Sequence, residues 1–237
     1  MKKLSLIILL ALWAYNLCHA QMADSATYLG NIKTELNKVW PKNRTINLVF
    51  HGHSVPAGYA ANHEVHTLDA YPTLLLQKLK AQYPYAVINI IVTAVGGETS
   101  VTGQTRFDAD VLPHKPDVLF IDYALNDRTI GLDAAKAAWE KMIQEALKHN
   151  IKVILLTSNP DTRVNIMATD SKSLYAYAQQ IRALAAKYHI GLADPFMDFQ
   201  KIYKEAGSIN DYMLWVNHPN KKGHTVIADE IFKWFSK

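Results

Sequence analysis

The sequence predicts a single α/β domain in which helices cover both faces of a parallel sheet. Three observations support this fold class. Five short apolar runs rich in β-branched residues alternate with segments whose apolar residues recur at helical spacing. No stretch with the composition of a linker separates them. The 237 residues, 49% hydrophobic and 19% charged, suffice for one core of ordinary size and exclude a disordered chain.

The first twenty residues predict a secretory signal peptide. Two lysines precede an apolar run, and the small residue Ala20 ends the stretch. We therefore assign residues 1–20 to a signal peptide and 21–237 to the domain, and we expect a secreted or periplasmic protein. The run is shorter than the about 20 residues that a membrane-spanning helix needs, so no transmembrane segment is expected after cleavage.

Cleavage after Ala20 would also remove the only cysteine, Cys18. The remaining chain then has no thiol for a disulfide, a nucleophile or a metal. Lipid attachment at Cys18 is a weaker alternative, because the residues before it are not small. Residues 1–20 hold two of the 25 basic residues and none of the 21 acidic ones, which leaves a net charge of about +2. Because the cations are also scattered, no nucleic acid is expected as a partner.

The first half of the domain is predicted to alternate helices and strands. Leu29, Ile32 and Leu36 are spaced as on one face of a helix. Pro72 is tolerated in the first turn of a later helix. The expected elements are helix 24–39, strand 46–50, helix 71–82, a buried strand 87–92 and strand 117–123.

The second half continues this alternation. The expected elements are helix 134–148, strand 151–157, helix 174–188, the short strand 191–193 and a last helix over 223–234. Continuous apolar runs are typical of parallel strands that are buried on both faces. Open sheets of this kind bind ligands beyond the carboxyl ends of their strands. A functional site is therefore expected among the residues that follow the strands.

Those residues carry the groups that acyl transfer needs. A serine is a weak nucleophile that requires an adjacent base, usually histidine, and the oxyanion of the tetrahedral intermediate requires N–H donors. The sequence offers a hydroxyl, a flexible backbone donor, an amide and an imidazole, in the segments His51-Gly52-His53-Ser54, Gly96-Gly97-Glu98-Thr99, Asn126-Asp127 and Asn217-His218-Pro219-Asn220.

These segments resemble, in the same order, the sequence blocks of the SGNH (GDSL-type) hydrolase superfamily. The resemblance spans residues 46–232. The matches are Gly52-His53-Ser54 to Gly-Asp-Ser, Gly97-Glu98-Thr99-Ser100 to the second block, Ala124-Leu125-Asn126-Asp127 to Gly-x-Asn-Asp, and His218-Pro219 to the end of Asp-x-x-His-Pro.

The resemblance implies a flavodoxin-like, three-layer α/β/α sandwich with about five parallel strands. It also implies ester hydrolysis without a metal or an organic cofactor. Ser54 would be the nucleophile, and His218 the general base and then the acid. The backbone N–H groups of Ser54 and Gly97 and the amide of Asn126 would form the oxyanion hole, each donor contributing ~3 kcal/mol to transition-state stabilisation.

The chain departs from the family at the third member of the triad. The acid expected three residues before His218 is Trp215, whose indole cannot accept the imidazole N–H. Asp211 is the candidate replacement, and a backbone carbonyl or an acid from elsewhere is the alternative. His53 replaces the family's Asp and Ala124 its Gly, and neither change is expected to affect the four chemical roles.

Several neighbouring residues allow more than one interpretation. Histidines 51, 53, 63 and 66 suggest a metal site, but the pair at 63 and 66 is spaced by three rather than by the four residues of the zinc-protease motif, so no metal is expected. Arg128 is either a ligand for a substrate anion or a solvated cation. Aromatic residues at the ends of elements form either a sugar-stacking surface or part of the core; they are Tyr59, Tyr71, Tyr123 and Trp215.

The sequence therefore predicts a secreted serine esterase that forms an acyl-enzyme on Ser54. Its expected substrate is a small-molecule or glycan ester, with O-acetyl groups on carbohydrate favoured. A lipid-directed lysophospholipase or thioesterase and an inactive carbohydrate-binding protein of the same fold are the alternatives. An α/β-hydrolase is disfavoured because Pro56 interrupts Gly-x-Ser-x-Gly. The sequence gives no indication of the oligomeric state.

Overall fold

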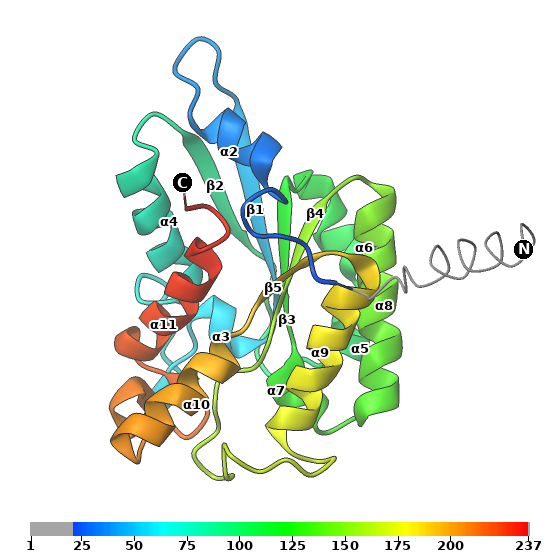
Figure 1. Cartoon of the computed structure of the whole chain (residues 1–237), viewed down its shortest axis with the longest axis vertical. Coiled ribbons are helices and arrows are strands. Elements are labelled where there is room, and N and C mark those ends of the chain that lie inside the picture. Colours follow the sequence, from blue (N-terminus) through cyan, green and yellow to red (C-terminus); the bar gives the residue numbers. More distant parts are fainter. Residues whose placement is uncertain (1–20, 237) are drawn as a thin grey trace, which may run out of the picture.

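A five-stranded parallel sheet forms the centre of the computed structural model, which describes residues 21–236 (Figure 1). The strand order is β2-β1-β3-β4-β5. The strands are β1 (Thr45–Gly52), β2 (Val87–Val92), β3 (Val118–Asp122), β4 (Lys152–Leu156) and β5 (Gly191–Ala193). This order confirms the predicted flavodoxin-like α/β fold. The signal peptide predicted over residues 1–20 lies outside the described residues.

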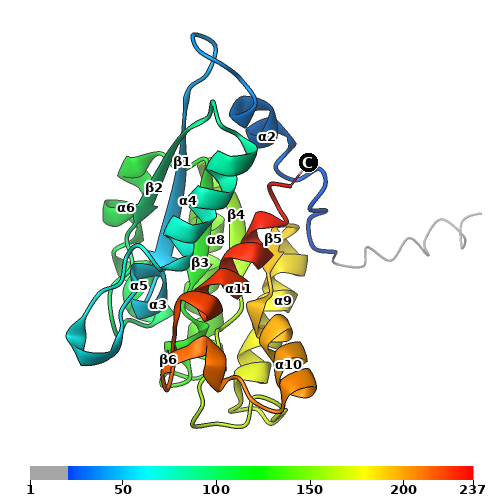
Figure 2. The ribbon, with the colours of Figure 1, turned by 90° about the vertical axis from the view of Figure 1, so that its left-hand side faces the viewer.

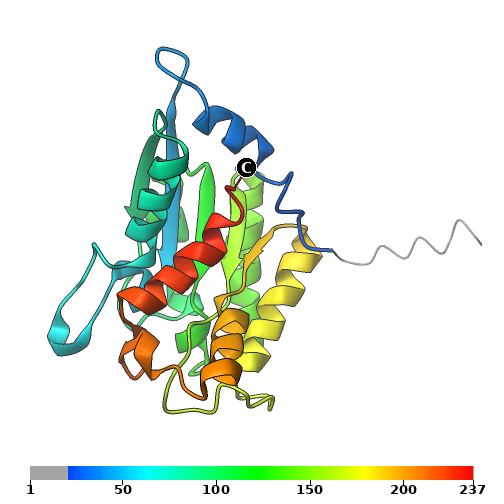
Figure 3. The same ribbon diagram turned by 60° about the vertical axis from the view of Figure 1, so that its left-hand side comes forward.

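Helices cover both faces of the sheet, as the sequence predicts (Figures 1 and 3). Successive strand residues face opposite sides, so Leu48 and Phe50 belong to one buried cluster and Val49 to the other. One face packs against α2 (Gly30–Leu36), α4 (Tyr71–Gln82), α10 (Pro195–Ala206) and α11 (Lys221–Phe232). The other packs mainly against α6 (Phe107–Asp110), α8 (Leu132–Lys148) and α9 (Leu174–Tyr188).

The first helix is shorter than the prediction of 24–39, because local hydrogen bonds end it on both sides. The Asp24 side chain accepts hydrogen bonds from the Ala26 N–H and the Thr27 hydroxyl, which forms a turn instead of a helix. At the other end, the Asn37 side chain donates to the carbonyl of Lys33. The helices predicted over 71–82 and 174–188 and the strands over 87–92 and 191–193 have the predicted bounds.

Strand β2 is not buried, contrary to the prediction. It lies at the edge of the sheet, and its side chains are exposed or half-buried. An apolar run at an edge cannot be distinguished by composition from one at the centre. The prediction also missed α10, although Asp194 caps it and Phe196 and Phe199 are buried at helical spacing.

The carboxyl ends of β1, β2 and β3 lie side by side, towards the lower end of the sheet in Figure 1. The carbonyl of Gly52 accepts a hydrogen bond from the Val95 N–H at 3.0 Å. In the β1–β3 register Gly52 is opposite Asp122, and a Cβ on Gly52 would lie 2.5 Å from the Asp122 carbonyl oxygen. Glycine is therefore required here for the two strands to approach each other.

Short elements beyond these strand ends carry the predicted site residues. They are α3 (Ser54–Ala57), α5 (Ser100–Thr105), α7 (Ala124–Asp127), the 3₁₀ turn Asn210–Tyr212, and the antiparallel pair β6 (Met213–Trp215) and β7 (His218–Pro219). Figure 2 shows β6 below α11, at the same end of the molecule as the loop after α3. Within residues 21–236, no helix has the length and apolar character required to cross a bilayer.

Candidate active site

Ser54 and His218 meet at the carboxyl end of the sheet. Ser54 is the first residue of α3, directly after β1, and its side chain is buried. Its Oγ lies 2.9 Å from Nε2 of His218, which is 164 residues later in the chain. Burial lowers the pKa of His218. A neutral imidazole at this distance is suited to accept the proton of the hydroxyl.

Two side chains of the loop after β4 fix the backbone that carries His218. The Asn159 amide donates to the carbonyl of Asn217 at 3.0 Å. The carbonyl of Val216 accepts from the backbone N–H of Thr162 at 2.7 Å and from its hydroxyl at 3.1 Å. The imidazole is thus anchored to the sheet through the residues that precede it.

Two of the predicted oxyanion donors, Gly97 and Asn126, lie on loops that are joined by a hydrogen bond. Gly97 has a φ of +77°, a left-handed conformation that favours glycine. Asn126 donates one amide hydrogen to the carbonyl of Glu98 at 2.9 Å, which leaves its second hydrogen for another acceptor. The backbone N–H groups of Ser54 and Gly97 donate to no group within the described part of the chain.

Buried ionic and polar contacts hold the glycine loop in place. The Glu98 carboxylate accepts hydrogen bonds from Arg106 at 2.8 and 3.0 Å and from the Tyr123 hydroxyl at 2.9 Å. Burial, followed by the charge of Glu98, raises the pKa of Tyr123 well above its ordinary value. These groups bind each other, so they fix the loop instead of offering free charges to a substrate.

Asp127 connects its own segment, Ala124–Asp127, to the segment Gly97–Ser100 through a hydrogen bond. Its carboxylate accepts from the Ser100 N–H at 2.8 Å and from the indole of Trp139 at 2.7 Å. Burial raises its pKa, although both hydrogen bonds act in the opposite direction. Asp127 therefore positions α5 and α7 and is not directed at Ser54.

The structure does not bring Asp211 to His218. Asp211 is exposed, and its backbone carbonyl accepts a hydrogen bond from Asn220. Within residues 21–236, the buried Nδ1 atom of His218 has no hydrogen-bond partner. Instead, the indole of Trp215 stacks on the imidazole, with ring centroids 5.7 Å apart and planes 15° apart. No carboxylate thus takes the position of the family's acid behind His218.

His53 is the residue that the sequence interpretation undervalued. Its Nδ1 lies 3.5 Å from Ser54 Oγ and accepts from the Val55 N–H at 3.3 Å. Its Nε2 faces Asp122 Oδ1 at 3.4 Å. The signal in the sequence was the replacement of the family's Asp by an imidazole, but its partner depends on the pairing of β1 with β3.

The structure locates the residues for which the sequence allowed more than one interpretation. Arg128 pairs with Asp161 at 2.6 Å, so it is neither a free anion ligand nor a solvated cation. Tyr71 and Tyr123 are buried, whereas Tyr59 and Trp215 are 38% and 54% exposed. His66 pairs with Glu64 on the surface. Among residues 21–236, no three His, Cys, Asp or Glu side chains are grouped as metal ligands.

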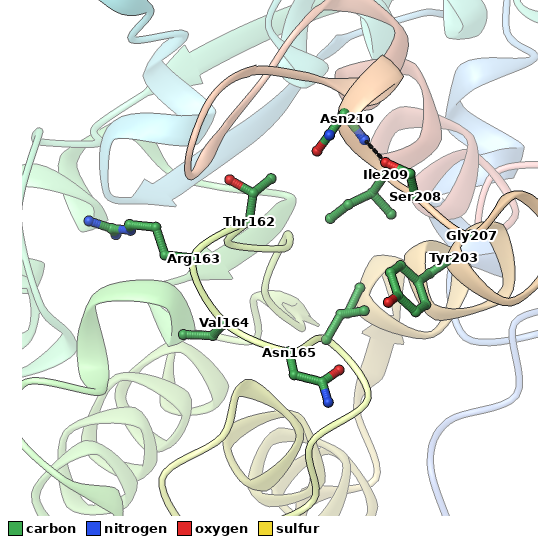
Figure 4. A pocket seen from close by; sticks show the side chains of 10 residues that line it. Thr162, Arg163, Val164, Asn165, Tyr203, Gly207, Ser208, Ile209 and Asn210 are labelled. Carbon is green, nitrogen blue, oxygen red and sulfur yellow. Dashed lines mark hydrogen bonds between the residues drawn. The ribbon is translucent and has the colours of Figure 1, made fainter.

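One pocket borders the hairpin that carries His218, and a second lies beside the turn that precedes this hairpin. One, of about 130 Å³, is lined by the loop after α3 and by residues around Pro219, with Tyr59, Leu214 and His224 among its walls. The other, of about 350 Å³, lies between the loop after β4 and the end of α10 (Figure 4). Thr162 lines the second pocket, and neither pocket has Ser54 or His218 in its wall.

The fold and the four sequence blocks at the carboxyl end of its sheet are those expected of the SGNH (GDSL-type) superfamily. In agreement, residues 50–226 match the GDSL-like Lipase/Acylhydrolase family, a match that covers more than half of the chain. The chain belongs to this family, and the resemblance drawn from its sequence blocks is confirmed.

Individual relatives are more distant. The uncharacterized lipoprotein YqeF of Bacillus subtilis (strain 168) is 37% identical over 82 residues, which are 31% of this chain and 33% of YqeF. A two-domain esterase (CEX) active on acetylated mannans has a TM-score of 0.72 at 19% identity, over 91% of this chain and 54% of that one. Axe2, an acetylxylan esterase from Geobacillus stearothermophilus, has a TM-score of 0.70 at 20% identity, over 81% and 94%. This chain spans about a third of YqeF and about half of the mannan esterase, and the two structures share its fold.

Proposed function

We propose that this protein is a serine esterase that removes short acyl groups, above all O-acetyl groups, from carbohydrate. The observation that carries the proposal is the 2.9 Å contact between Ser54 Oγ and His218 Nε2. The left-handed loop at Gly97 and the amide of Asn126, which are joined through Glu98, follow the neighbouring strands β2 and β3 and are the proposed N–H donors. A hydroxyl, a base and N–H donors are the three requirements of acyl transfer.

The reaction proceeds in two halves. Ser54 Oγ attacks the ester carbonyl carbon while its proton passes to His218 Nε2, and the N–H groups of Ser54, Gly97 and Asn126 bind the oxyanion. His218 then protonates the departing alcohol, which leaves an acyl-enzyme. A water molecule gives its proton to His218 and attacks the acyl carbon, and His218 returns that proton to Ser54 as the carboxylic acid departs.

An acetylated carbohydrate is favoured as the substrate by two observations. The half-exposed rings of Tyr59 and Trp215 border Gly96 and His218 respectively, and aromatic faces suit sugar rings. Axe2 and the mannan esterase, which share the fold, are described as acting on acetylated polysaccharides.

Export is part of the proposal. Residues 1–20 would direct secretion and be cleaved after Ala20, which leaves domain 21–237 outside the cytoplasm. The similarity to a lipoprotein keeps lipid attachment at Cys18 as the competing form. Intact mass of the protein recovered from the expressing cells distinguishes the two, because a cleaved chain begins at Gln21 and a lipidated one at Cys18.

The test compares the wild type with Ser54→Ala and His218→Ala. The wild type should hydrolyse p-nitrophenyl acetate faster than the octanoate, release acetate from acetylated xylan or mannan oligosaccharides, and gain mass on Ser54 after fluorophosphonate treatment. Each variant should retain less than about one thousandth of the activity. Preference for octanoate would instead support a lipid acyl hydrolase. Glycan binding without hydrolysis or labelling would support an inactive binding protein.

A further inference from the structure

Three of the buried polar side-chain atoms that lack a hydrogen-bond partner, among residues 21–236, lie around Ser54. They are His53 Nε2, Asp122 Oδ1 and His218 Nδ1. Unpaired buried polar atoms are uncommon and are often found where a site has a functional role. Two of these atoms, on His53 and Asp122, face each other at 3.4 Å.

The position of the proton on His53 follows from its contacts. The Val55 N–H donates to Nδ1, so Nδ1 holds the lone pair and the proton of a neutral ring is on Nε2. That nitrogen lies 3.4 Å from Asp122 Oδ1, a close contact that lacks the geometry of a hydrogen bond. Both side chains are buried, at 0% and 4% exposure, so in the described chain each atom has only the other as an available partner.

Asp122 is held from its other side. The Tyr71 hydroxyl donates to Asp122 Oδ2 at 3.1 Å. Burial and the negative charge of Asp122 both raise the pKa of Tyr71 well above its usual value, so Tyr71 stays a donor. A chain of contacts therefore runs from Tyr71 through Asp122 and His53 to the backbone N–H of Val55 and the hydroxyl of Ser54.

We propose that His53 and Asp122 are positioning residues that together replace the single acid of the family's Gly-Asp-Ser block. The His53 ring caps α3 and fixes Ser54, and the carboxylate behind it supplies negative charge beneath the nucleophile. This inference rests on the proposed function. It assigns the carboxylate of the site to Asp122, on the side of the nucleophile. His218 has no carboxylate of its own, because Trp215 occupies the position of the family's acid.

The pair also affects the base through its charge. His53 Nδ1 and His218 Nε2 lie 3.5 and 2.9 Å from Ser54 Oγ, so the Asp122 carboxylate behind His53 is on the opposite side of this hydroxyl from the base. When His218 receives the serine proton it becomes positive, and a negative charge in the same poorly solvated region would stabilise it. The other titratable groups around the two imidazoles are Asp127, next to His53, and His224, next to His218. Without the negative charge at 122, the imidazolium is less stable and His218 loses its proton at lower pH.

The test uses Asp122→Asn, His53→Asp and the double variant H53D/D122N. Asp122→Asn should lower kcat and the rate of fluorophosphonate labelling by about 10- to 100-fold, the effect of losing a bond to a charged group. It should also shift the acidic limb of the pH profile of kcat/KM to lower pH. His53→Asp alone places two carboxylates together and should be impaired. The double variant has one carboxylate, a cap and no imidazole, and should recover activity relative to both single variants.

Asp194→Asn is the matched control, because Asp194 is also a buried carboxylate but is bonded to Arg182 at 2.7 Å and to Thr157 at 2.8 Å, away from Ser54. It should lower thermal stability without moving the acidic limb. An Asp122→Asn protein with the wild-type labelling rate and pH profile would overturn the inference, as would a double variant weaker than both single ones. A wild type that neither hydrolyses esters nor reacts with fluorophosphonate would instead refute the proposed function.

Discussion

At the scale of single residues, the proposed chemistry depends on how the imidazole of His218 is held. Its Nε2 faces Ser54, but its Nδ1 has no partner among the described residues. Orientation must come from contacts other than a bond to a carboxylate. The stacked indole of Trp215 and the anchored backbone before His218 are the contacts that restrict it.

Activity should persist below the ordinary pKa of histidine. Burial lowers the pKa of His218, and the neutral ring is the form that accepts the serine proton. The acidic limb of kcat/KM for p-nitrophenyl acetate should therefore have its midpoint below pH 6.5. A midpoint at or above pH 6.5, measured before any unfolding, would contradict the proposed role of this ring.

Trp215 should contribute to rate through its ring. Replacing it with Ala removes the stacking face that orients the imidazole and attracts its positive form, so kcat should fall by about 3- to 30-fold. Trp215→Phe keeps an aromatic face and should retain most of the activity. Since p-nitrophenyl acetate carries no sugar, KM for it should change little. An Ala variant with wild-type kcat would show that stacking has no role in the reaction.

At the scale of elements, the loop after β4 acts as a support for the hairpin of β6 and β7. Asn159 is buried, and its amide reaches the carbonyl next to His218. Asn159→Ala should therefore lower kcat about tenfold and leave that carbonyl unpaired. Thr162→Val is the matched control. It loses a hydroxyl bond to Val216 but keeps the backbone N–H bond to the same oxygen, so its kcat should fall less.

Steady-state kinetics of both variants, with unfolding curves, separate positioning from folding. If Asn159→Ala and Thr162→Val lose equal activity and equal stability, the loop has only a general structural role. If Asn159→Ala loses more rate than stability, the loop determines where the imidazole lies.

Elements and site were predictable from sequence to different degrees. Helices 71–82 and 174–188 have the predicted bounds because apolar residues at helical spacing and a helix-starting Pro72 or Ser173 agree there. The meeting of Ser54 with His218 was expected from the resemblance to the SGNH blocks, because Ser54 follows a predicted strand whereas His218 precedes the last helix. The contact of His53 with Asp122 was not predictable, because it depends on the β1–β3 register.

At the scale of the whole molecule, two buried histidines lie on opposite sides of the sheet and link stability to pH. His51 is enclosed beside Gly103 and Phe107, and His224 accepts the backbone N–H of Tyr71. Burial, helped by the charge of Arg106, lowers the pKa of His51 to about 4. Burial likewise lowers the pKa of His224 to about 4. Both rings are neutral in the folded protein at pH 7.

Stability should therefore decrease as the pH falls from 6.5 to 4. In this window the unfolded chain binds protons that the folded chain does not. The free energy of unfolding is therefore highest above pH 6.5 and decreases by about 3 kcal/mol per histidine by pH 4. Urea unfolding at pH 7, 5.5 and 4.5 measures this slope. His51→Gln should be less stable at pH 7 yet have a shallower slope, because residue 51 then takes up no extra proton on unfolding. An unchanged slope in that variant would mean that His51 is protonated in the folded state, against the burial that surrounds it.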